Sequence, residues 1–288
     1  MNKVKVFLEM IKFEHTVFAL PFAYMGAILA ATTSTGALPA WSDIGWITLA
    51  MVGARSAAMG LNRVIDAAFD AENPRTALRA IPAGLLSKKE VLVFISVSFA
   101  LLFFAAAQLN PLCVRLLPVA VFFLTFYSYT KRFTWLCHVV LGVTIALAPL
   151  GGWVAVTGAF DPVALVLFGA VAFWVAGFDI LYACQDVDFD RRRGLHSIPA
   201  RFGVARALLI ARSFHVLTAV GLVSIWAMAD LGWAYAVGLG IAYAVLAYEH
   251  ALVKPHDLSR INTAFMTMNG ILSLVMFVFT LIDAALLA

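Results

Sequence analysis

The chain has 288 residues, of which 63% are hydrophobic and only 12% charged, and its mean hydropathy is +0.95. This composition excludes an ordinary water-soluble domain, and no polar stretch is long enough to form one, so we expect a single membrane-embedded unit over residues 1–288. The net charge of +4 is dispersed, which excludes a nucleic-acid-binding patch. The three cysteines are far apart and predict neither a disulfide framework nor a zinc site.

Residues 1–15 are basic and amphipathic, and no small-residue cleavage site follows them, so a cleavable signal peptide is not expected. Apolar spans follow, each near the roughly 20 residues that cross a bilayer. The sequence predicts nine transmembrane helices, at about 16–34, 44–62, 90–109, 112–129, 136–156, 162–184, 206–228, 231–252 and 264–287.

The loops between these spans alternate in charge. Loops after the second, fourth, sixth and eighth spans carry Lys and Arg, whereas those after the first, third, fifth and seventh carry neither. The positive-inside rule therefore predicts a cytoplasmic N-terminus and an external C-terminus.

Two rows of polar side chains stand at the cytoplasmic ends of the second and sixth spans. The first row is Asn62, Asp66 and Asp70, and the second is Asp179, Asp186 and Asp190. The first-row residues are four apart and would stack on one face of a helix. Asp66 and Asp186, like Asp70 and Asp190, are 120 residues apart, which predicts a duplicated chain with halves of about 1–132 and 133–288.

Basic residues lie on the same side as both rows. Arg75 and Arg79 follow the first row, Arg191, Arg192 and Arg193 follow the second, and Lys131 with Arg132 ends the fourth span. Acidic side chains alone would bind cations, and basic side chains alone would bind anions. Together they suit a metal–diphosphate, in which Mg²⁺ bridges carboxylates to phosphate oxygens.

Other interpretations remain open for single residues. One aspartate at a span edge is often only solvated, and the arginine run is most often a topology anchor. Arg55 lies within the second span and is expected to pair with an acid or an anionic substrate. His15 is either a base, a polar lining group or an interfacial residue.

Rival classes of membrane protein fit less well. A cation-coupled transporter using the intramembrane aspartates is the alternative, but transporters more often place such acids near the midplane. A CDP-alcohol phosphotransferase would carry a compact D-x-x-D-G-x-x-A-R run, which is absent.

The segments N-R-V-I-D-A-A-F-D, N-P-R-T and Y-A-C-Q-D-V-D-F-D resemble the two Asp-rich motifs of the UbiA superfamily of membrane prenyltransferases, and Y-S-Y-T-K-R-F-T-W-L-C-H-V-V-L-G resembles its central block. The likeness runs from the first span to about residue 206. One departure is Arg63, where many members have Asp. The opening I-K-F-E-H-T-V-F-A-L-P-F-A resembles a bacterial branch near the 4-hydroxybenzoate enzymes, of which some belong to the futalosine route to menaquinone and use a dihydroxynaphthoate.

The resemblance implies an all-α bundle of nine transmembrane helices around a central cavity in a bacterial inner membrane. It implies Mg²⁺-dependent transfer of a polyprenyl group from its diphosphate to an aromatic acid, in ubiquinone or menaquinone biosynthesis. Asn62, Asp66 and Asp70 would hold one Mg²⁺, and Asp186 and Asp190 the second. Substrate binding would fall to Arg75, Lys131, Tyr182 and Arg192, and Arg55 would position the acceptor's carboxylate. Asp179 or Asp190 would accept the ring proton.

Overall fold

The computed structural model describes residues 3–11 and 16–287, and all regular elements in these ranges are helical. In this part of the chain, nine helices are long and apolar enough to cross a membrane. They are α2 (Thr16–Thr35), α3 (Trp41–Ile65), α5 (Lys88–Leu109), α6 (Pro111–Thr130), α7 (Cys137–Thr157), α8 (Pro162–Ala183), α11 (Val204–Met228), α12 (Trp233–Leu252), and the π-helix η3 (Thr263–Met268) continued by α13 (Asn269–Leu287). The nine predicted spans are confirmed, and the protein is a multi-pass membrane protein.

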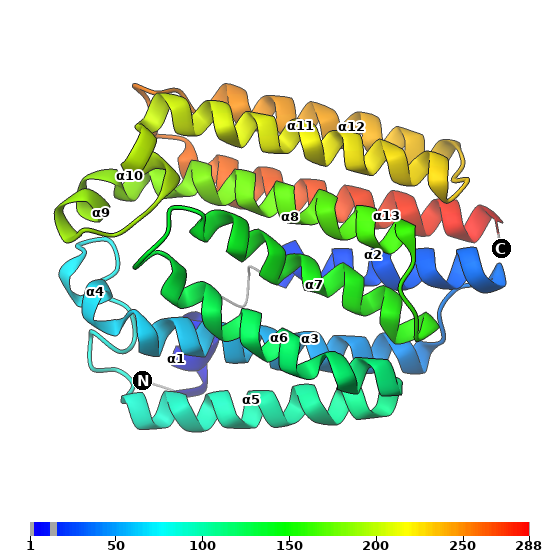
Figure 1. Cartoon of the computed structure of the whole chain (residues 1–288), viewed down its shortest axis with the longest axis horizontal. Helices are drawn as coiled ribbons and strands as arrows, with labels where there is room; N and C mark the ends of the chain where they lie inside the picture. Colours follow the sequence, from blue (N-terminus) through cyan, green and yellow to red (C-terminus); the bar gives the residue numbers. More distant parts are fainter. Residues whose placement is uncertain (1–2, 12–15, 288) are drawn as a thin grey trace.

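Short helices gather at one end of the bundle. They are α4 (Ala67–Glu72), the 3₁₀ turn η2 (Cys184–Asp186), α9 (Val187–Arg193) and α10 (Ile198–Phe202). Figure 1 shows α4, α9 and α10 together at the left, while the last turn of α13 lies at the opposite end. Both polar rows therefore reach the same end of the molecule.

Local sequence sets where several spans begin. Ser87 and Glu90 form a reciprocal capping box at the start of α5. Asn110 and Asp161 cap α6 and α8 with their side chains, and a proline at the first helical position follows each of them. These caps satisfy backbone N–H groups that would otherwise lack a partner.

The helices α2 and α7 pack with their backbones in close approach. A Cβ atom added to Gly26 would lie 2.1 Å from the carbonyl oxygen of Pro149, and one added to Gly152 would lie 2.1 Å from that of Ala23. Only glycine fits either position without a shift of backbone, as in small-residue contacts between membrane helices. This contact joins α2, which comes before the helix that carries Asn62, to α7, which comes before the helix that carries Asp179.

Large apolar side chains fill the interior and also cover the outer surface of the bundle. Trp174, Tyr235 and Phe22 are almost fully buried in the main core. Large apolar side chains such as Phe104 and Phe122 face outward, as expected where the surrounding solvent is lipid.

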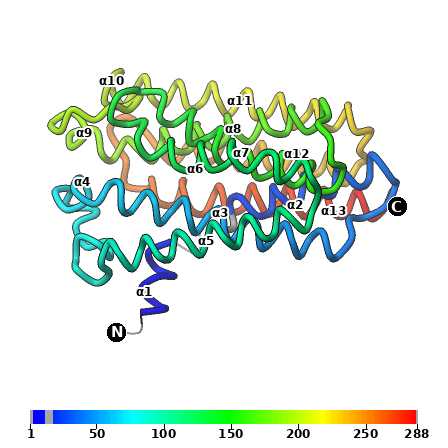
Figure 2. Tube along the Cα trace, turned by 60° about the horizontal axis from the view of Figure 1, so that its bottom comes forward, coloured from blue at the N-terminus to red at the C-terminus, as the bar shows by residue number. Residues whose placement is uncertain are grey.

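Helix α1 (Lys3–Met10) stands outside the bundle and extends from it on the side of α5, as Figure 2 shows. Val6 and Met10 are buried against the bundle, and the ring of Phe7 stacks on that of Phe94 with centroids 4.9 Å apart. The predicted amphipathic character of this segment is confirmed for the residues described.

Candidate active site

A polar cavity of about 300 Å³ opens where the spanning helices meet the short ones. Its wall includes all six residues of the two rows, namely Asn62, Asp66, Asp70, Asp179, Asp186 and Asp190. Residues from the two halves of the sequence thus face one space.

Each row crosses a break in its helix at an aspartate. Asp66 separates α3 from α4 with φ −90° and ψ 2°, and Asp186 precedes α9 with φ −102° and ψ 6°. These values lie in the sparsely populated bridge region, where many active-site residues occur. The sequence predicted stacked rows on helices; the structure adds that each row turns at an aspartate, Asp66 in the first and Asp186 in the second.

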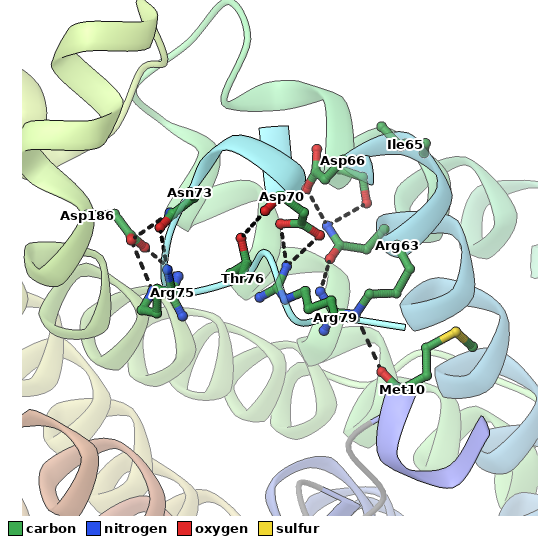
Figure 3. Close-up of polar contacts among 12 residues, drawn as sticks. Met10, Arg63, Ile65, Asp66, Asp70, Asn73, Arg75, Thr76, Arg79 and Asp186 are labelled. Carbon is green, nitrogen blue, oxygen red and sulfur yellow. Dashed lines mark hydrogen bonds and ion pairs between the residues drawn. The ribbon is translucent and has the colours of Figure 1, made fainter. Parts of the chain in front are cut away.

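The first row is held by arginines and by its own members (Figure 3). Nη1 of Arg79 donates to both carboxylate oxygens of Asp70, at 2.7 and 2.9 Å. Nη2 of Arg132 lies 3.5 Å from Oδ1 of Asp66, and Nδ2 of Asn62 donates to Oδ2 of Asp66 at 2.9 Å. These contacts hold both carboxylates at the wall of the cavity.

Arg63, the departure from the family pattern, bonds to the amide of the row and to the backbone of the N-terminal helix. Its side chain is buried and donates to the carbonyl of Met10 at 3.4 Å and to Oδ1 of Asn62 at 3.1 Å. It therefore joins α1 to the first row, a role that the sequence did not suggest.

The second row has three different environments. Arg75 pairs with Asp186 through two hydrogen bonds, from Nε at 3.0 Å and from Nη2 at 2.6 Å. Asp190 accepts a hydrogen bond from Ser197 at 2.9 Å, while its Oδ1 is buried without a partner. Asp179 lies 2.6 Å from Nδ1 of His138.

Burial and nearby charges shift the pKa values of Asp66 and Arg75 in opposite directions. Burial raises the pKa of Asp66 above its ordinary value, and the nearby charge of Lys131 works against that rise. Burial lowers the pKa of Arg75, but its hydrogen bonds and charge interaction with Asp186 outweigh this and leave it raised. Arg75 therefore keeps its positive charge in the site.

The donor set of the cavity fits a hard divalent cation. Carboxylate and amide oxygens are the ligands that Mg²⁺ and Ca²⁺ prefer, and Oδ1 of Asp190 is a buried acceptor that lacks a partner. Within the described residues, however, no three Asp, Glu, His or Cys side chains already form a metal cluster. Asp70 and Asp186 are each engaged by an arginine instead.

Of the remaining predicted residues, three line the cavity and one lies outside it. Arg55, Lys131 and Tyr182 line the cavity, and the hydroxyl of Tyr182 accepts a hydrogen bond from Nη1 of Arg75 at 3.2 Å. Arg192 is exposed on α9 and is not part of the cavity wall. Its neighbour Arg193 pairs with Glu72. His15 lies outside the described residues.

Several residues at the site were not singled out from the sequence. His138 is buried at the start of α7, and its Nε2 accepts the backbone N–H of Ile198 at 3.3 Å, so Nδ1 is the nitrogen that donates to Asp179. Asn73 donates to Asp186 at 3.2 Å, and Ser197 holds Asp190. Two of them lay in segments that resemble family motifs, because Asn73 opens N-P-R-T and His138 lies in Y-S-Y-T-K-R-F-T-W-L-C-H-V-V-L-G.

A second, apolar cavity of about 380 Å³ adjoins the polar one. The two cavities share part of their walls, namely Arg55, Met59, Tyr127, Leu141 and Ile145. The apolar cavity lies among α3, α5, α6 and α7, and apart from Arg55 it carries no charged side chain. A ligand with a charged head and a long apolar tail would fit the pair.

Comparison with known proteins agrees with this arrangement. The model of the UbiA prenyltransferase family matches residues 19–271, and the chain belongs to that family. The match extends beyond residue 206, so the resemblance to the family covers more of the chain than the motifs indicated.

Relatives of known name include 4-hydroxybenzoate octaprenyltransferases. The protein of Xanthomonas oryzae pv. oryzae (strain PXO99A) is 34% identical over 234 residues, which cover 78% of this chain and 73% of that protein. The protein of Aliivibrio salmonicida (strain LFI1238) is 28% identical over 288 residues, which cover 100% of this chain and 99% of that protein.

Solved structures share the fold. The apo structure of a UbiA homologue from Aeropyrum pernix K1 has a TM-score of 0.85 and 31% identity, covering 94% of this chain and 98% of that one. A UbiA homologue from Archaeoglobus fulgidus, bound to DMAPP and Mg²⁺, has a TM-score of 0.76 and 18% identity, covering 97% and 99%. The predicted all-α fold and the predicted class of enzyme, a prenyltransferase, are confirmed. The transporter alternative receives no support.

Proposed function

We propose that this chain transfers a polyprenyl group from its diphosphate to an aromatic hydroxy acid at the junction of the two cavities. The observation that carries the proposal is their continuity. Carboxylates and bases line one cavity, apolar groups line the other, and both share the wall at Arg55 and Tyr127. An allylic diphosphate has the same two parts.

In this proposal the diphosphate lies in the polar cavity among Arg75, Arg79 and Lys131. Their positive charges neutralise the leaving group as the bond between its oxygen and the prenyl carbon breaks. Mg²⁺ held by Asn62, Asp66, Asp70, Asp186 and Asp190 would supply further neutralisation of the diphosphate. Arg75 and Arg79 are well placed to exchange a carboxylate for a phosphate oxygen, because bidentate binding suits both.

The acceptor ring then forms a carbon–carbon bond to the prenyl carbon, ortho to its hydroxyl, and releases one proton. Asp179 is the better candidate to accept that proton. Asp66, Asp70 and Asp186 face arginines, whereas the partner of Asp179 is the imidazole of His138. Arg55 would bind the acceptor's carboxylate at the boundary of the cavities.

The charged loops and the active site would face the cytoplasm of a bacterial inner membrane. This orientation is supported by the distribution of Lys and Arg among the loops. The two halves of about 1–132 and 133–288 would descend from a duplication within a single unit, which the equivalent helix breaks at Asp66 and Asp186 support.

A product assay tests the function. Purified protein in detergent with Mg²⁺ and a polyprenyl diphosphate is incubated with 4-hydroxybenzoate or, separately, with 1,4-dihydroxy-6-naphthoate. The names of the relatives favour the first acceptor. We expect a prenylated ring in one tube that is lost on addition of EDTA. If neither ring is prenylated by folded protein with several chain lengths, this acceptor class is wrong.

A further inference from the structure

The last spanning segment begins with a π-helix, η3 (Thr263–Met268), which runs directly into α13 (Asn269–Leu287). A π-turn holds about one residue more than an α-turn, and such turns are frequent at functional sites. Phe265 lies within η3 and lines the polar cavity. The C-terminal part of the chain therefore reaches the site, although it carries none of the acidic motifs.

Phe265 packs against three other aromatic residues of the cavity. Its ring centroid is 4.2 Å from that of Tyr182, 5.4 Å from that of Phe178 and 5.5 Å from that of Phe18. We call these four residues the aromatic wall. Tyr182 also accepts a hydrogen bond from Arg75, so the wall adjoins the groups that would hold the diphosphate.

Asn269 holds the π-turn from within the bundle. Its Nδ2 donates to the carbonyls of Ala264 and Phe265, at 3.1 Å each. In an α-helix the backbone N–H of residue 269 would serve the carbonyl of Phe265, but here it bonds to Met266. The Asn269 side chain thus supplies the donor that the altered backbone does not.

The orientation of this amide is determined by its other partners. Nε1 of Trp174 donates to Oδ1 of Asn269 at 2.6 Å, and Oε1 of Glu249 accepts from Nδ2 at 2.8 Å. An indole N–H can only donate, so Oδ1 of Asn269 faces Trp174 and the amide nitrogen faces the π-turn. Trp174 and Asn269 are fully buried and Glu249 nearly so.

Loss of the π-turn would change which side chains face the cavity. Relaxing it to an α-turn shifts the helix by one residue, which rotates the preceding residues by about 100° around the axis. Phe265 would then leave the aromatic wall, and water would gain access beside Tyr182.

We propose that Asn269 is a positioning residue, which holds Phe265 in the aromatic wall and thereby keeps water from the prenyl carbon. This inference rests on the proposed function. When the carbon–oxygen bond breaks, the prenyl cation is captured either by the acceptor ring, which forms the product, or by water, which forms a prenyl alcohol and releases a proton. An ordered aromatic wall favours the first outcome, because it stabilises a cation and excludes water.

The test compares the ratio of prenylated product to prenyl alcohol at saturating acceptor. We expect Asn269→Leu and Phe265→Leu each to lower this ratio on the order of tenfold, the size of one cation–π contact, while diphosphate is still consumed. The double variant should be no worse than either single variant, because both changes remove the same placement of Phe265. Trp174→Phe, which removes the indole N–H that orients Asn269 and the part of the ring system that carries it, should lower the ratio in the same direction.

Thr280→Val is the matched control. Thr280 is also fully buried on α13, but its hydroxyl bonds to the carbonyl of Met276, away from the π-turn. It should keep the ratio of the parent protein. The inference is overturned if folded Asn269→Leu keeps the product-to-alcohol ratio of the parent protein. If Asn269→Leu does not fold, the same result in folded Trp174→Phe overturns it. It is also overturned if the effects of Asn269→Leu and Phe265→Leu add up in the double variant. A parent protein that consumes no diphosphate overturns the proposed function, and this inference with it.

Discussion

Arg75 and Asp186 lie 111 residues apart in the chain, and their side chains form a bidentate pair with distances of 3.0 and 2.6 Å. Arg75 belongs to the loop after the first acidic row and Asp186 to the helix break in the second. The pair therefore ties together the two halves of the site. It also places a permanently positive group beside a carboxylate that the proposal assigns to a cation.

Arg75→Ala should raise the KM for the polyprenyl diphosphate by about ten- to a hundredfold, since a charged hydrogen bond contributes roughly 1.5–3 kcal/mol. Steady-state kinetics with the donor varied measure this. Arg192→Ala is the control, because Arg192 is exposed and lies outside the cavity wall. Equal effects of both substitutions would return Arg192 to the diphosphate site, as the motif resemblance predicted.

Asp66→Asn and Asp190→Asn should each raise the Mg²⁺ concentration that gives half-maximal activity by tenfold or more, an order-of-magnitude estimate for the loss of a charged ligand. Direct binding of Mn²⁺, followed by electron paramagnetic resonance, should weaken in parallel. Asp188→Asn is the matched control, because Asp188 lies on α9 beside the row but is exposed. Unchanged Mn²⁺ binding in both row variants would contradict the metal assignment.

His138→Ala should lower kcat by about tenfold and leave the KM for the diphosphate unchanged, since its hydrogen bond holds Asp179 and no phosphate group. Rates at saturating substrates compared with rates at low diphosphate separate the two parameters. Cys137→Ala, at the neighbouring position in the same cavity wall, should behave as the parent protein. A His138→Ala variant whose main defect is donor binding would show that this histidine acts on the diphosphate.

Arg55→Ala should mainly raise the KM for the aromatic acid, because the guanidinium lies where the polar and apolar cavities meet. Assays in which each substrate is varied in turn measure the effect. Arg115→Ala removes an exposed arginine of α6 and serves as the control for loss of charge. If Arg55→Ala weakens donor binding and leaves the acceptor KM unchanged, Arg55 belongs to the diphosphate site.

The sequence by itself determined the number of the membrane spans and, to within about three residues, their limits. Hydrophobic length is a local property, and the ends of α5 and α6 are marked by residues that act locally, such as Ser87 and Asn110. The acidic rows were also visible, because four-residue spacing places side chains on one helix face. Their helix breaks were not, because the backbone angles of Asp66 and Asp186 depend on how the short helices pack.

Only the tertiary structure decided which side chains meet. It pairs Arg75 with Asp186, places His138 behind Asp179, and leaves Arg192 outside the cavity, although all three lie near a motif in sequence. Trp174 and Asn269 are separated by 95 residues and contact each other through one hydrogen bond. Such pairs depend on how α8 and α13 approach each other in the bundle, and no local pattern of hydropathy or charge specifies that approach.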